Sequence, residues 1–154
     1  MTAETRTPVI LVVDDDPSSL DVAARLLERQ GYRTRRAANG PQCIEIARTE
    51  AIDLVLLDVM MPGMDGFEVC TALRALDPSR RLPVILLTAR TDLDTRLEGM
   101  QHGISEFLTK PINKHELYAR VRAQIHILEL TRQLESVERK VAPAAARRPT
   151  PGER

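Results

Sequence analysis

The chain has 154 residues, with 22 basic and 22 acidic side chains and no net charge, so its composition gives no reason to expect nucleic acid or a membrane surface as the main partner. Two cysteines, Cys43 and Cys70, are too few for a disulfide framework and fit a reducing compartment. The N-terminal sequence has no secretory signal, and no apolar run approaches the ~20 residues of a membrane span. We therefore expect a soluble, cytoplasmic protein.

Short apolar runs alternate along the chain with longer amphipathic segments. The apolar runs are predicted to be strands, and the segments with apolar residues three or four positions apart are predicted to be helices. The expected elements, in chain order, are a strand at 9–13, a helix at 18–31, a strand at 32–38, a helix at 40–50, a strand at 53–57, a helix at 65–76, a strand at 83–88, a helix at 92–103, a strand at 106–111 and a helix at 113–140. Five strand–helix repeats predict an α/β fold in which helices cover both faces of a parallel five-stranded sheet.

Polar side chains stand at the carboxyl ends of four of these predicted strands. Asp14 and Asp15 follow the first strand, Asp58 follows the third, Thr88 ends the fourth and Lys110 lies near the end of the fifth. In open parallel sheets, ligands bind outside the carboxyl ends of the strands. We therefore expect these five side chains to converge at one edge of the sheet.

The expected cluster has a definite chemistry. Two carboxylates about 4 Å apart repel each other by roughly 4 kcal/mol at an effective dielectric constant of about 20, so three in one pocket need a cation, and oxygen ligands suit Mg²⁺ or Mn²⁺. A carboxylate such as Asp58 can act as a nucleophile and form an acyl phosphate. Lys110 and the metal would neutralise the phosphoryl oxygens, and Thr88 can donate a hydrogen bond to them.

Several nearby residues are interpreted as structural. Asp16 is predicted to cap the helix that starts beside it. Gly63 and Gly66 are predicted to let the segment after Asp58 turn tightly and begin the next helix. The three histidines have no metal-ligand spacing and are predicted to face solvent; they are His102, His115 and His126.

Four motifs stand in order along the chain: "ILVVDDD" at 10–16, "LLDVMMPGMDG" at 56–66, "VILLTA" at 84–89 and "FLTKP" at 107–111. Together, in this order and at this spacing, they resemble the receiver domain of response regulators over about residues 8–128. The resemblance implies a flavodoxin-like (βα)5 fold with strand order 2-1-3-4-5. It also implies that Asp58 accepts a phosphoryl group from a sensor histidine kinase or a phosphotransfer protein.

The same resemblance implies roles for the other motif residues. Mg²⁺ would be held by Asp14, Asp15, Asp58 and the backbone carbonyl of Met60, with Asp15 as a direct ligand. Thr88 and Phe107 would be the switch residues. Lys110 would be the lysine of the site, and its peptide bond to Pro111 would be cis. Phosphorylation would switch the surface formed by the fourth helix, the fifth strand and the fifth helix. Slow self-dephosphorylation is expected, but not enzymatic turnover of a separate substrate.

The last predicted helix is longer than a receiver needs. Leu117, Val121 and Leu128 form a stripe that should face the core. A second stripe has the 4-3-4-3-4 spacing of a coiled coil, over fewer than three heptads; it comprises Ala123, Ile127, Leu130, Leu134, Val137 and Val141. We expect this stripe to pair with a second copy or another protein. The alternative is an exposed overhang without a partner.

The expected organisation is a receiver domain at 8–128, an extended helix at 129–141 and a disordered, proline-containing tail or linker at 142–154. The tail leaves open whether the chain is a stand-alone receiver or the receiver portion of a longer regulator whose output domain is missing. Two further alternatives are a receiver-like binding module that works without phosphorylation and a phosphatase of the haloacid dehalogenase type. The phosphatase needs an aspartate where this chain has Met60. Nucleic-acid binding is disfavoured, because the sequence has no aromatic platform and no recognition helix.

Overall fold

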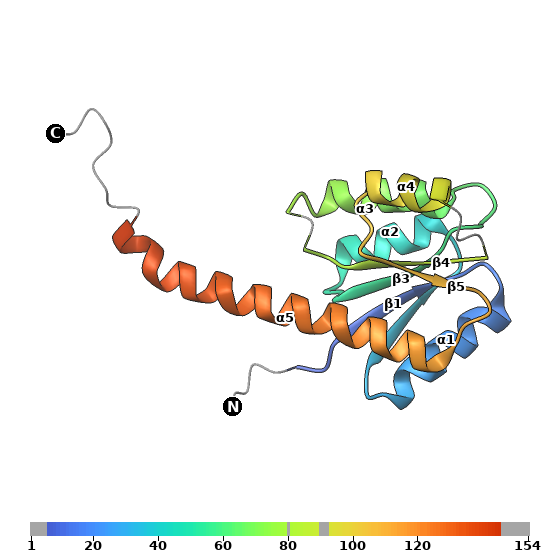
Figure 1. The fold of residues 1–154 in the computed structure, drawn as a ribbon, viewed down its shortest axis with the longest axis horizontal. Coiled ribbons are helices and arrows are strands. Elements are labelled where there is room, and N and C mark those ends of the chain that lie inside the picture. The colour runs from blue at the N-terminus through green and yellow to red at the C-terminus, as the bar shows by residue number, and fades with distance from the viewer. Residues whose placement is uncertain (1–5, 80, 90–92, 146–154) are drawn as a thin grey trace.

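The computed structural model describes residues 6–79, 81–89 and 93–145. Five parallel strands form one sheet in the order β2-β1-β3-β4-β5, as predicted (Figure 1). The strands are β1 (Val9–Val13), β2 (Arg33–Ala37), β3 (Leu54–Asp58), β4 (Val84–Thr88) and β5 (Glu106–Thr109). Helices α1 (Pro17–Arg29) and α5 (Lys114–Ala145) cover one face, and α2 (Gly40–Thr49), α3 (Gly66–Leu76) and α4 (Leu93–Gln101) lie on the other.

The central strands are apolar throughout because both of their faces are covered. Along β3, Val55 and Leu57 belong to the core under α2 and α3, whereas Leu54 and Leu56 belong to the core under α1 and α5. All four side chains are fully buried. This double burial holds the carboxyl end of β3, which carries Asp58, in a fixed place.

Local signals set where the helices near the site begin. Asp16 caps α1 and accepts hydrogen bonds from the Ser18 N–H and the Ser19 hydroxyl, which confirms its predicted structural role. Asp65 caps α3 in a capping box with Glu68, so the segment after Asp58 ends in a well-defined helix start.

Element boundaries shift by a few residues from the prediction. The fifth strand, expected at 106–111, ends at Thr109, since Pro111 has no N–H to add to a strand ladder. The helix expected at 92–103 ends at Gln101. The last helix continues to Ala145, so residues 142–145, expected in a disordered tail, are helical. Residues 146–154 of that expected tail lie outside the described residues.

The first part of α5 packs on the core and the second part extends past it (Figure 1). Leu117, Val121 and Leu128 are buried as predicted, and Ile125 joins them. The residues of the second stripe that have described side chains are exposed; they are Ala123, Ile127, Leu130, Leu134 and Val137. Across the described residues, no helix is both long and apolar enough to cross a membrane.

Candidate functional site

Three carboxylates meet at the carboxyl edge of the sheet. Asp14 follows β1 and Asp58 ends β3, and both are buried, with exposed fractions of 2% and 4%. Asp15 is exposed beside them. One carboxylate oxygen from each lies within 4.8 Å of the others, so the predicted convergence of Asp14, Asp15 and Asp58 is present in the structure.

Lys110 supplies the positive charge of this cluster. Its Nζ lies 3.1 Å from Asp14 Oδ2 and 3.3 Å from Asp58 Oδ2. The Lys110 backbone N–H donates to the Thr88 carbonyl at 2.9 Å, which ties the segment after β5 to the end of β4. The peptide bond between Lys110 and Pro111 is cis. The lysine therefore bridges the two buried carboxylates.

Backbone N–H groups orient the same two carboxylates. Asp14 Oδ1 accepts from the Asp16 N–H at 2.9 Å, and Asp58 Oδ1 accepts from the Met60 N–H at 3.2 Å. The Met60 side chain is 64% exposed, so Met60 contacts Asp58 through its backbone N–H. The role of the Met60 carbonyl as a metal ligand stays a prediction.

The first residue of α3 lies directly against the acceptor strand. The Gly66 N–H donates to the Val59 carbonyl at 2.9 Å. A Cβ atom at Gly66 would lie 2.8 Å from both the Asp58 carbonyl oxygen and Val59 Cα, closer than real Cβ contacts allow. Gly63 has a φ angle of +82°, which favours glycine for a different reason. The structure therefore explains why glycine is needed at both positions: close backbone contact at Gly66 and a positive φ angle at Gly63.

Burial and charge act against each other on the ionisation of the site. Burial raises the pKa of Asp58; the Lys110 ammonium opposes this, and the neighbouring Asp14 adds to it. Burial also opposes the charge of Lys110, but its contacts with Asp14 and Asp58 outweigh that effect and raise its pKa. Burial, together with the negative charge of Asp14, therefore disfavours the ionised Asp58 carboxylate.

The donor set fits a hard divalent cation. Three carboxylates that share one pocket with a single lysine provide oxygen ligands and uncompensated negative charge, which suit Mg²⁺ or Mn²⁺. Asp14, Asp15 and Asp58 are the residues that would hold such an ion.

The two predicted switch residues lie on β4 and β5, the strands that follow β3 in the sheet. Thr88 ends β4 and is 1% exposed. Phe107, on β5, is half-buried, and a Cβ atom on Gly99 of α4 would lie 2.5 Å from its ring. The Phe107 ring therefore supports α4 directly. The switch roles of Thr88 and Phe107 stay predictions.

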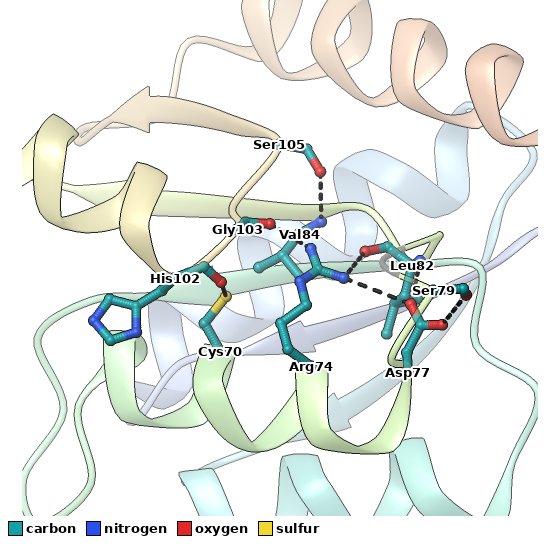
Figure 2. Close-up of polar contacts among 9 residues, drawn as sticks. All are labelled: Cys70, Arg74, Asp77, Ser79, Leu82, Val84, His102, Gly103 and Ser105. Atoms are coloured by element: carbon teal, nitrogen blue, oxygen red, sulfur yellow. Dashed lines mark hydrogen bonds and ion pairs between the residues drawn. The ribbon is translucent and has the colours of Figure 1, made fainter.

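A polar cluster between α3 and the turn before β5 was not foreseen (Figure 2). His102, expected to face solvent, is half-buried; it stacks on Phe67 with ring centroids 5.6 Å apart, and its Nδ1 lies 2.6 Å from the Thr71 hydroxyl. Arg74 donates to the carbonyls of Leu82 at 2.7 Å and Gly103 at 2.6 Å. The interpretation of His102 was wrong: this cluster joins α3 to the carboxyl end of α4.

The raised pKa of Asp58 predicts a specific pH dependence in the absence of divalent cations. A carboxyl group whose folded pKa lies above its unfolded value of about 3.9 contributes its full stability below that value, and the contribution falls as pH rises through the folded pKa. The wild type should therefore match an Asp58→Asn variant at about pH 3 and become less stable than it towards about pH 7. Thermal melts of both proteins in chelator across this range measure the difference. A constant difference would contradict the burial argument.

Comparison with known proteins agrees with the resemblance to receiver domains. The family model described as "Response regulator receiver domain" matches residues 10–122. Response regulator PleD of Caulobacter vibrioides is 40% identical over 144 residues, covering 90% of this chain and 32% of PleD. Transcriptional regulatory protein YvrH of Bacillus subtilis is 41% identical over 117 residues, covering 75% of this chain and 48% of YvrH. The chain thus spans about a third of one relative and about half of the other.

A solved structure shows the same fold. Chemotaxis protein CheY4 of Vibrio cholerae superposes with a TM-score of 0.74 at 30% identity, covering 77% of this chain and 98% of CheY4. The sheet order, the acidic cluster with its lysine and the match over most of the chain point to one conclusion: this chain belongs to the response regulator receiver domain family.

Proposed function

We propose that Asp58 accepts a phosphoryl group from a phosphohistidine on a sensor kinase or a phosphotransfer protein, in a Mg²⁺-dependent reaction in the cytoplasm. The observation that carries the proposal is the position of the Asp58 carboxylate, which is buried at a strand end, within 4.8 Å of two other carboxylates and 3.3 Å from Lys110 Nζ. The complete set of site residues disfavours a binding module that works without phosphorylation. Buried charges of this kind reduce the stability of a domain, and they are typical of functional sites.

Each residue has a distinct part in the transfer. An oxygen of Asp58 attacks phosphorus, so an O–P bond forms while the N–P bond to the donor imidazole breaks. Lys110 now pairs with Asp58 Oδ2, and it remains within reach to pair with a phosphoryl oxygen after transfer. When bound by Asp14, Asp15, Asp58 and the Met60 carbonyl, Mg²⁺ supplies positive charge to the phosphoryl oxygens. Water then hydrolyses the acyl phosphate slowly.

Phosphorylation adds about −1.5 to −2 charges and three acceptor oxygens at the edge of the sheet. Thr88, at the end of the neighbouring strand, would donate its hydroxyl to the new group, and Phe107 would move with it. Because the Phe107 ring lies against Gly99 of α4, its movement would change the α4, β5 and α5 surface. The modification thereby biases an equilibrium between two conformations that already exist.

The first test is metal-dependent phosphorylation of the full chain by acetyl phosphate. In the presence of Mg²⁺, we expect intact-mass spectrometry to detect one added phosphoryl group. Chelation of the metal should reduce the signal to background, because the crowded carboxylates then repel the incoming phosphoryl oxygens. Equal incorporation with and without divalent cations would reject the metal-dependent part of the proposal.

We further propose that the exposed stripe of α5 pairs with a second copy of the chain. The stripe is narrow and has coiled-coil spacing, which fits one partner helix rather than a sheet. In a parallel pair, Gln133 of one copy would face Glu138 of the other, and His126 would face Thr131. Among these flanking positions no like-charged side chains meet, so self-pairing meets no electrostatic barrier there.

A glutamate placed in the stripe tests this pairing. Leu134 is 64% exposed, so Leu134→Glu should leave the monomer stable. In a pair, the new carboxylate would be desolvated at the seam, and we expect association to weaken by roughly 100-fold or more. Sedimentation equilibrium measures this change. Ser136→Glu adds the same charge outside the stripe, and this variant should associate like the wild type. Equal association of the two variants would refute pairing through the stripe.

A further inference from the structure

A buried carboxylate at the opposite edge of the sheet has no part in the proposed phosphoryl transfer. Asp53 precedes β3 and is 2% exposed. Its Oδ1 accepts a hydrogen bond from Arg6 at 2.7 Å and forms an ion pair with Arg132 at 3.0 Å, and its Oδ2 accepts a hydrogen bond from the Val9 N–H at 2.8 Å. Burial of a carboxylate is costly unless ion pairs and hydrogen bonds compensate for the lost water. It joins the segment before β1 to a residue late in α5.

A second ion pair joins the same part of α5 to the body of the domain. Glu135, one turn after Arg132, lies 2.5 Å from Arg81, which precedes β4. Arg132 and Glu135 continue the helix face that Val121 and Leu128 bury in the core. Beyond Leu128, this face therefore changes from apolar to ionic contacts with the body.

Apolar packing does not hold this part of the helix. No side chain of residues 129–138 is buried. A cavity of about 330 Å³ lies between the helix and the body, with Arg6, Arg81 and Arg132 among its lining residues and Ile52, Leu73 and Leu82 on its apolar side. The ion pairs of Arg132 and Glu135 bridge the helix to the body around this cavity.

We propose that these two ion pairs form a latch that holds the distal arm, residues 129–145 of α5, helical and in a fixed direction. Because most of the stability of a helix in a protein comes from tertiary packing, the arm needs contacts with the body or with a partner. The exposed residues Leu130, Leu134 and Val137 lie on the side of the arm away from the latch. The latch therefore prepares the arm for pairing and lowers the ordering cost of association.

The latch joins the matched domain to parts of this chain that the family match leaves out. Asp53 and Arg81 lie within residues 10–122, whereas Arg6, Arg132 and Glu135 lie outside them. The consequence for pairing rests on the self-association proposed above, whereas the latch itself is independent of phosphorylation. The two can therefore be tested separately.

Hydrogen exchange on the unphosphorylated full chain, at concentrations where it is monomeric, tests the latch. In Arg132→Gln, we expect the amides of residues 129–138 to exchange about tenfold faster than in the wild type, because the ion pair with the buried Asp53 carboxylate is lost. Arg132→Lys should restore part of the protection. Arg122→Gln, the same change at an exposed position of the same helix, should exchange like the wild type. Unchanged exchange in Arg132→Gln, or equal acceleration in Arg122→Gln, would overturn the latch.

Asp53→Asn probes the latch from the body, where it should accelerate exchange in the same residues of the arm. Sedimentation equilibrium then tests the consequence: Arg132→Gln should weaken self-association about tenfold without changing phosphoryl incorporation. Weaker association with unchanged exchange would mean that Arg132 acts by another route, and the latch would be rejected. Absent phosphorylation in the wild type would reject the proposed transfer alone, and the exchange result would still decide the latch.

Discussion

Replacement of Asp58 by asparagine is expected to reduce phosphoryl incorporation to background while the domain remains folded. The amide has nearly the same shape as the carboxylate, but its oxygen is a poor nucleophile and the residue brings no negative charge to a metal. Intact-mass spectrometry after incubation with acetyl phosphate and Mg²⁺ measures the loss. Asp16→Asn is the matched control, since it makes the same change two residues from Asp14, and asparagine caps a helix as well as aspartate does.

The stability of the Asp58→Asn variant distinguishes a lost acceptor from a lost fold. Because burial raises the pKa of Asp58, the ionised carboxylate is a cost to the metal-free domain at neutral pH. The variant should therefore unfold at a higher temperature than the wild type in chelator, unlike most substitutions of buried residues. Residual incorporation in a variant that is stable would show that another residue accepts the phosphoryl group.

The sequence predicted the sheet and the acidic cluster because both depend on short, local patterns. Apolar runs such as Leu54–Leu57 indicate strands that are buried on both faces. Once these strands are taken as parallel, their carboxyl ends must meet, so Asp14 and Asp58 can be placed together without any structure. The strand order was predicted from the resemblance that the four motifs carry together, because no single apolar run indicates which strands are neighbours.

Long-range pairs and the ends of elements were harder to predict. Periodicity gives no signal for an ion pair between Asp53 and Arg132, because each residue is unremarkable in its own segment. His102 was interpreted as solvent-facing since its contacts with Phe67 and Thr71 depend on how α3 lies beside the turn before β5. Pro143 was interpreted as part of a disordered tail because proline is unfavourable after the first turn of a helix, but α5 continues through it to Ala145.

Gly66→Ala is expected to destabilise the domain by about 3 kcal/mol, because the added Cβ would meet backbone atoms rather than a flexible side chain. The atoms in question are the Asp58 carbonyl oxygen and Val59 Cα, each 2.8 Å away. Relief of this overlap requires α3 to move away from the strand that carries the proposed acceptor. Urea denaturation measures the stability change, and acetyl phosphate incorporation measures the effect on the site.

Gly63→Ala separates this overlap from simple backbone strain. Gly63 lies in the same segment and has a positive φ angle, but a Cβ there would meet nothing within 4 Å. Its substitution should cost only about 1 kcal/mol and leave incorporation near the wild-type level. If Gly66→Ala were as mild as Gly63→Ala, α3 would be free to shift without disturbing Asp58. A larger loss at Gly66, with slower incorporation, would mean that contact with the first residue of α3 helps to hold the acceptor aspartate in place.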